Sequence, residues 1–154
     1  MYADYGYYVQ SYRGDILNAD NADIWLERAS TEIDRMTMDR LQKNGMPTAD
    51  YHQRRIKYAV CAVAEELYQI DALQKASAAS IGVDGMYHGP IASISSGKES
   101  ISYSSGGSVY AKSAASNEVR NASVNSLIKG YLVGVPDGSG INLLYGGMGG
   151  NYVR

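Results

Sequence analysis

The 154-residue chain lacks the features that mark several protein classes. Its single cysteine excludes an internal disulfide framework and suits a reducing cytosol. A net charge of −2 and a pI of about 5.6 do not fit a basic nucleic-acid binder. The sequence has no apolar run of the roughly 18–20 residues that a membrane span requires. Its first residues lack the basic and apolar regions of a signal peptide. We therefore expect neither a membrane segment nor a signal peptide.

Phenylalanine is also absent, whereas there are 14 tyrosines. Five of these tyrosines fall within the first 12 residues. A tyrosine ring supplies apolar area and its hydroxyl supplies a hydrogen-bonding group, a combination typical of surfaces that become buried against a partner. We therefore treat residues 1–19 as a separate tyrosine-rich segment whose composition suits such a surface.

Helical periodicity begins after this segment. Asp20 or Asn21 can cap a helix that continues to about Leu41, and Asn44-Gly45 then stops it. A second helix is predicted from about Thr48 to Lys75. The short link predicts two antiparallel helices that form a hairpin core over residues 20–76. The core residues expected from the two apolar stripes are Trp25, Ile33, Met36, Ile56, Val60, Val63 and Leu67.

The second half of the chain has a different composition, rich in glycine and serine. Residues 77–115 read as an extended β arm, in which Ile101 and Tyr103 alternate with serines. A third helix is predicted over 116–133, and residues 134–154 form an extended tail. The predicted fold is therefore mainly α: a small helical bundle of two long antiparallel helices and a shorter C-terminal helix, with an extended Ser/Gly-rich β arm and an extended tail.

Residues that suggest phosphate or metal chemistry do not form a complete motif. Gly97-Lys98 would need a glycine at 92 and a hydroxyl at 99 to form a phosphate-binding loop, and the chain has Ala92 and Glu99. The two histidines, His52 and His88, have no converging ligands in the sequence. We expect no cofactor and no metal site.

The remaining candidates also favour structural roles. Cys61 lies on the apolar stripe of the second helix and is expected to be buried. Glu65 and Glu66 are adjacent, so their side chains diverge, and we expect a solvated face rather than an acid pair. A basic cluster after the turn could indicate helix-turn-helix DNA binding, although acidic residues flank it. Its members are Arg54, Arg55 and Lys57. The residues thus predict no enzyme.

Five stretches, in order along residues 20–150, resemble the head–tail connector (adaptor) family of long-tailed bacteriophages. "ERASTEIDRMTMDRL" and "RRIKYAVCAVAEEL" look like its first two core helices. "SISSGKESISYS" is similar to its Ser-rich segment, with Lys98 inserted into the pattern. "SLIKGYLVG" and "INLLYGGM" look like its last helix and closing strand. The chain departs from the family at Gly146-Gly147, where a basic residue is usual, and in a longer "VPDGSG" insert.

The resemblance implies a structural virion protein, made in the host cytoplasm and placed at the head–tail connector. It would form a homo-oligomeric ring of twelve copies beneath the portal protein, extend the channel through which genomic DNA passes, and dock a stopper or tail-completion protein. The Ser-rich segment would be an intersubunit arm with Ile94, Ile101 and Tyr103. The tail would bind the portal through Ile141, Leu143, Leu144 and Tyr145. The alternative is a small helical DNA-binding packaging factor that uses the basic cluster.

Overall fold

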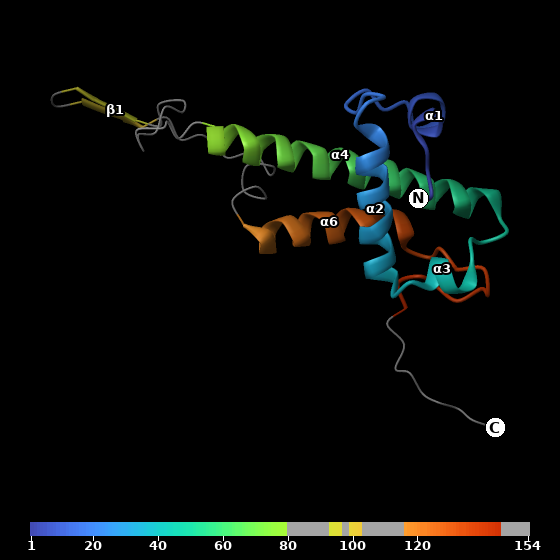
Figure 1. Cartoon of the computed structure of the whole chain (residues 1–154). Helices are drawn as coiled ribbons and strands as arrows, with labels where there is room; N and C mark the ends of the chain where they lie inside the picture. Colours follow the sequence, from blue (N-terminus) through green and yellow to red (C-terminus); the bar gives the residue numbers. More distant parts are fainter. Residues whose placement is uncertain (80–92, 97–98, 103–115, 146–154) are drawn as a thin grey trace. The chain divides into compact units, whose positions relative to one another are not determined.

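The computed structural model describes residues 1–79, 93–96, 99–102 and 116–145. The chain is mainly helical, as the sequence predicts (Figure 1). The elements are α1 (Tyr5–Tyr7), the π-helix η1 (Tyr8–Tyr12), α2 (Ala22–Thr37), α3 (Arg40–Asn44), α4 (Asp50–Ala79), β1 (Ser93–Ser96), β2 (Glu99–Ser102) and α6 (Asn117–Leu132). Met1–Glu65 and Val124–Arg154 form one compact unit, and Glu66–Ser123 form a second.

Helix α2 is shorter than the periodicity predicts. Asn21 is at its N-cap position, but the Asn21 side chain makes no capping bond to the helix and instead accepts a hydrogen bond from the backbone of Asn18. The helix ends at Met38 and Asp39, which both have a φ of 57°. Because left-handed backbone is uncommon without glycine, the sequence contains no signal for this break. Leu41 therefore belongs to the separate helix α3.

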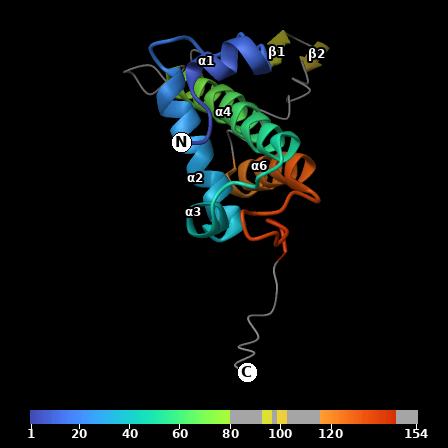
Figure 2. The same cartoon turned by 90° about the vertical axis from the view of Figure 1, so that its right-hand side faces the viewer.

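The long helices also differ from the predicted antiparallel hairpin. Helix α2 runs across α4 rather than along it (Figure 1). The connection between them, residues 38–49, contains α3 and is therefore longer than the short link that an antiparallel pair needs. Within the first unit, α1 and α3 lie toward opposite ends of α2 (Figure 2).

The core of the first unit consists of apolar side chains from α2, α4 and α6. Burial in this unit follows most of the predicted stripe, but Met36 is half-buried. The predicted residues that are buried in this unit are Trp25, Ile33, Ile56, Val60 and Val63. Leu41, which the stripe of the first predicted helix reaches, is also buried. Buried side chains outside the predicted stripes are Leu26, Ile128, Leu132, Val135 and Leu143. The helical period thus identifies much of the core, and other helical positions together with Val135 and Leu143 supply the rest.

The second unit contains the later turns of α4, the strands β1 and β2, and the first turns of α6. Leu67 and Ile70 are buried in it. The two strands pair antiparallel, with Ile94 opposite Ile101. Tyr103, which we expected in the same arm, lies outside the described residues. None of the helices in the described part of the chain is long and apolar enough to cross a membrane.

Candidate functional site: the tyrosine strap and the C-terminal turn

The first 17 residues, which we call the tyrosine strap, lie against α2 and α4. Tyr8 is fully buried, so this part of the tyrosine-rich segment is buried against the same chain and needs no partner protein to cover it. The Tyr2 hydroxyl donates a hydrogen bond to Asp34 on α2. The Tyr58 hydroxyl on α4 donates to the Ser11 carbonyl at 3.1 Å. The strap is therefore anchored to both helices by tyrosine hydroxyls.

Glu65 is the main anchor on α4. Its two carboxylate oxygens accept hydrogen bonds from the hydroxyls of Tyr8 at 2.7 Å and Tyr12 at 3.2 Å. Burial and the Glu65 hydrogen bond raise the pKa of Tyr8 to about 12, although two backbone N–H groups act in the opposite direction. Burial and the Glu65 charge also raise the pKa of Tyr12. Both tyrosines therefore remain neutral donors near neutral pH.

The expectation that Glu65 and Glu66 form a solvated face is wrong. Glu65 is half-buried beneath the strap, and Glu66 is only 9% exposed. The Glu66 carboxylate accepts a hydrogen bond from the Ser123 hydroxyl at 2.7 Å within the second unit. The side chains do diverge, as adjacent helical positions require, but each one finds a hydroxyl partner. The helical period predicts that the two carboxylates lie on different faces of α4. It does not predict which hydroxyl groups will bind them.

Cys61 lies between Tyr58 and Glu65 on the same face of α4, since the positions are three and four residues apart. It is fully buried, as expected. Burial, with smaller effects from the charges of Glu65 and Asp4, raises the pKa of its thiol to about 12. A thiol with that pKa has very little thiolate at neutral pH, so the closed structure does not favour nucleophilic chemistry at Cys61.

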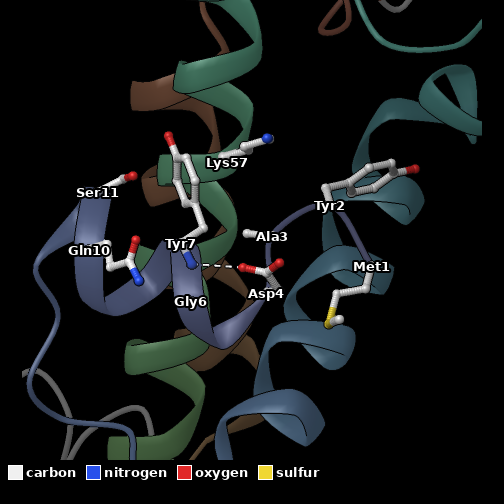
Figure 3. Close-up of a pocket in the computed structure, with 9 residues that line it drawn as sticks. All are labelled: Met1, Tyr2, Ala3, Asp4, Gly6, Tyr7, Gln10, Ser11 and Lys57. Atoms are coloured by element: carbon white, nitrogen blue, oxygen red, sulfur yellow. Dashed lines mark hydrogen bonds between the residues drawn. The ribbon is translucent and has the colours of Figure 1, made fainter.

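A hollow of about 500 Å³ opens on the strap (Figure 3). The Lys57 ammonium lies 4.9 Å from the centroid of the Tyr7 ring, where a cation is attracted by the ring face. The Asp4 carboxylate accepts a hydrogen bond from the Tyr7 backbone at 2.7 Å. Lys57 is therefore engaged with the strap, and it does not act only as part of a basic cluster with Arg54 and Arg55. Of these three side chains, Arg54 is exposed and the other two are half-buried.

Residues 133–145, which we call the C-terminal turn, follow α6 and fold back. The Leu143 N–H donates to the Val135 carbonyl at 2.9 Å, and Pro136 and Asn142 form an isolated bridge. Leu143 is 2% exposed, so this part of the predicted extended tail belongs to the domain core. Of the four predicted portal-binding residues, Ile141 is 49% exposed and Tyr145 is 64% exposed, whereas Leu144 is half-buried.

A buried carboxylate organises this turn. Asp137 accepts hydrogen bonds from Asn44 at 2.7 Å and from the backbone N–H groups of Ser139 and Ile141, both at 2.9 Å. The Ser139 hydroxyl adds another at 2.7 Å. Burial alone would raise the pKa of Asp137, but these hydrogen bonds outweigh it and lower the pKa to about 2. The "VPDGSG" stretch is thus a folded turn that is fixed by its own aspartate.

The remaining candidates for chemistry stay apart. Within residues 1–79, 93–96, 99–102 and 116–145, no group of three or more His, Cys, Asp or Glu side chains could hold a metal ion. His52 lies on the first turns of α4. The second histidine, His88, and the Gly97-Lys98 pair lie outside the described residues. In the described part of the chain, the carboxylates of Asp34, Glu65, Glu66 and Asp137 stabilise the fold through hydrogen bonds to other side chains.

No family model, no curated protein and no solved structure matches this chain.

Proposed function

We propose that the chain is a structural subunit of a bacteriophage head–tail connector, which forms a twelvefold ring beneath the portal. The observation that carries the proposal is the order of the family-like stretches along the fold. "ERASTEIDRMTMDRL" falls on α2 and α3, "RRIKYAVCAVAEEL" falls on α4, and "SLIKGYLVG" falls on the last turns of α6. Each helix-like stretch therefore coincides with a helix, in the sequence order that the resemblance implies.

The use of acidic groups also supports a scaffold rather than an enzyme. Asp34, Glu65, Glu66 and Asp137 all accept hydrogen bonds from side chains of the same chain. A catalytic acid or base must reach a substrate proton, and these oxygens already have internal partners. These carboxylates therefore stabilise the folded chain, as expected of a structural ring subunit.

Two irregular segments are the contacts that the connector requires. The Ser-rich segment is the intersubunit arm, and its strands β1 and β2 pair antiparallel, with Ile94 opposite Ile101. The C-terminal turn and the residues after it dock the portal. Since Leu143 is internal, we assign the portal contact to the exposed side chains of Ile141 and Tyr145. One such contact is weak, but a ring repeats it and raises the effective concentration of the others.

Negative-stain microscopy of the purified protein over a range of concentrations tests the ring. We expect closed rings with a central channel, and fluorescence anisotropy should detect no binding to duplex DNA near physiological salt. A chain that stays monomeric at every concentration and binds duplex DNA with submicromolar, salt-dependent affinity would instead be the packaging factor. In that case Arg54 and Arg55 would be the first residues to substitute.

The docking contact has its own test. The double variant Ile141→Ser/Tyr145→Ser should lose co-sedimentation with portal rings, because it removes exposed apolar area without disturbing the core. The matched control is Ile24→Ser, which changes another exposed apolar side chain on α2. If the double variant still sediments with the portal, these side chains do not form the contact.

A further inference from the structure

The tyrosine strap is held to the helices by hydroxyl hydrogen bonds and ring contacts, and few of its side chains are buried. Among residues 1–17, only Ala3, Tyr8 and Leu17 are buried, and the others are exposed or half-buried. The segment crosses α2 and α4 through hydroxyl–carboxylate and hydroxyl–carbonyl hydrogen bonds. A region with few buried apolar contacts opens at a lower free energy than the core on which it lies.

The Tyr8 hydroxyl is the point where the strap is fastened. It donates a hydrogen bond to Glu65 on α4 and accepts two others, from the backbone N–H groups of Ile16 at 3.0 Å and Leu17 at 3.1 Å. One oxygen atom therefore joins α4 to the end of the strap. Gly14 makes room for the ring, because a Cβ atom at this position would lie 2.1 Å from Cζ of Tyr8.

The strap covers one face of α4. Tyr58 contacts the rings of Tyr7 and Tyr12, with centroids 6.2 and 5.5 Å apart. Glu65 binds the Tyr12 hydroxyl two turns further along the helix. Cys61 is between these two contact points and is fully buried. The raised pKa of its thiol, to which the charge of Asp4 on the strap contributes, agrees with this placement.

We propose that residues 1–17 open and close as one unit over the α4 face of Tyr58, Cys61 and Glu65 while the helical core stays folded. The closed form is the structure described above. The open form presents a surface that the closed form lacks, in which both carboxylate oxygens of Glu65 are free beside an aromatic ring and a thiol. This inference concerns the single subunit, and it is independent of whether the chain forms a connector ring.

The chain carries its own reporter for this opening, because Cys61 is its only cysteine. The rate at which excess 5,5′-dithiobis(2-nitrobenzoate) labels the native protein at pH 8 measures how often the thiol becomes accessible. We expect labelling in the absence of urea to be faster than global unfolding permits, with a weak dependence on urea. A weak dependence is the signature of a small opening, since the slope scales with the surface that is exposed.

Two variants should loosen the strap. Tyr8→Phe keeps the ring and removes the hydroxyl, and the loss of a hydrogen bond to a charged group should speed labelling about tenfold or more. Gly14→Ala keeps the hydroxyl and pushes the ring out, and should also speed labelling. The matched control is Tyr51→Phe, the same chemical change at a 62% exposed position on α4, which should leave the rate unchanged.

The wild-type measurement alone can overturn the proposal. If Cys61 reacts only with the free energy and full urea slope of global unfolding measured by circular dichroism, no separate opening exists. The proposal also fails if Tyr8→Phe and Gly14→Ala both label at the wild-type rate. Failure of either kind leaves the connector proposal untouched, because its ring and docking tests do not use the strap.

Discussion

The tyrosine strap and the C-terminal turn both lie outside the long helices of the first unit, and they are fixed in different ways. The strap has one local carboxylate bond, from the Tyr7 N–H to Asp4, but its attachment to the helices depends on Asp34 on α2 and Glu65 on α4. The turn contains its own carboxylate, Asp137, which collects backbone N–H groups from the turn itself. We expect the turn to keep its local conformation when a contact with the rest of the chain is lost, because its carboxylate binds its own backbone. We expect the strap to detach as a whole when its hydrogen bonds to the helices are lost.

The largest expected effect is on the core that supports both segments. Trp25 is 8% exposed on α2, and Trp25→Ala should lower the free energy of unfolding by about 3–5 kcal/mol. Because strap and turn rest on the same helices, both should be lost in one transition. Urea denaturation followed by circular dichroism measures this, and a loss below about 1 kcal/mol would place the ring outside the core.

A smaller but still large effect is expected at Gly138 in the turn. A Cβ atom there would lie 2.1 Å from the backbone oxygen of Asn44, which has little freedom to move. Gly138→Ala should therefore cost about 3 kcal/mol. Gly130→Ala is the control, because nothing lies within 4 Å of that position on α6. An equal melting temperature for the two variants would show that the turn is not docked on Asn44.

The turn should also weaken in acid. The pKa of Asp137 falls from its ordinary value of 3.8 to about 2 in the folded chain, so its contribution is fully present above pH 4. That contribution is lost as the pH falls from about 4 to about 2. Asp137→Asn should cost about 2 kcal/mol at pH 7, and the difference between variant and wild type should shrink over this pH range. Urea titrations at several pH values would reveal a constant difference if Asp137 were not the group responsible.

The smallest expected effect on global stability is at Gly14 in the strap. A Cβ atom at position 14 would lie 2.1 Å from the Tyr8 ring, the same distance that separates a Cβ at position 138 from the backbone of Asn44. The Tyr8 ring is a side chain and can move away, whereas the backbone of Asn44 cannot do so easily. Gly14→Ala should therefore lower global stability by less than about 1 kcal/mol, even though it changes Cys61 labelling. A loss as large as that of Gly138→Ala would mean that strap and core unfold together, which removes the contrast between the two segments.

The sequence predicts the helices because their apolar residues repeat with the helical period, as at Trp25, Ala29 and Ile33. It does not predict the break after Thr37, since Met38 and Asp39 adopt left-handed backbone without a glycine. The crossing of α2 over α4 depends on the connection through α3, which has no periodic signal. Long-range side-chain bonds, such as Tyr8 to Glu65, leave no local pattern that a sequence could show.

The turn around Asp137 could have been found. An aspartate followed by glycine, serine and glycine is a common turn pattern, since the carboxylate binds N–H groups a few residues later. In the resemblance to the connector family, "VPDGSG" counts only as an insert before the apolar side chains of the tail. The pattern at Asp137 therefore predicts a folded turn rather than an extended segment.

The hydrogen bond between Asn44 and Asp137 joins residues that are 93 positions apart. During synthesis the ribosome adds about 5–20 residues per second. Asn44 therefore leaves the ribosome about 5–20 seconds before its partner, on that range of rates. For that interval Asn44, at the end of α3, is without the carboxylate that it later binds. The order of synthesis thus delays the docking of the C-terminal turn on α3 until every helix in the described part of the chain has been made.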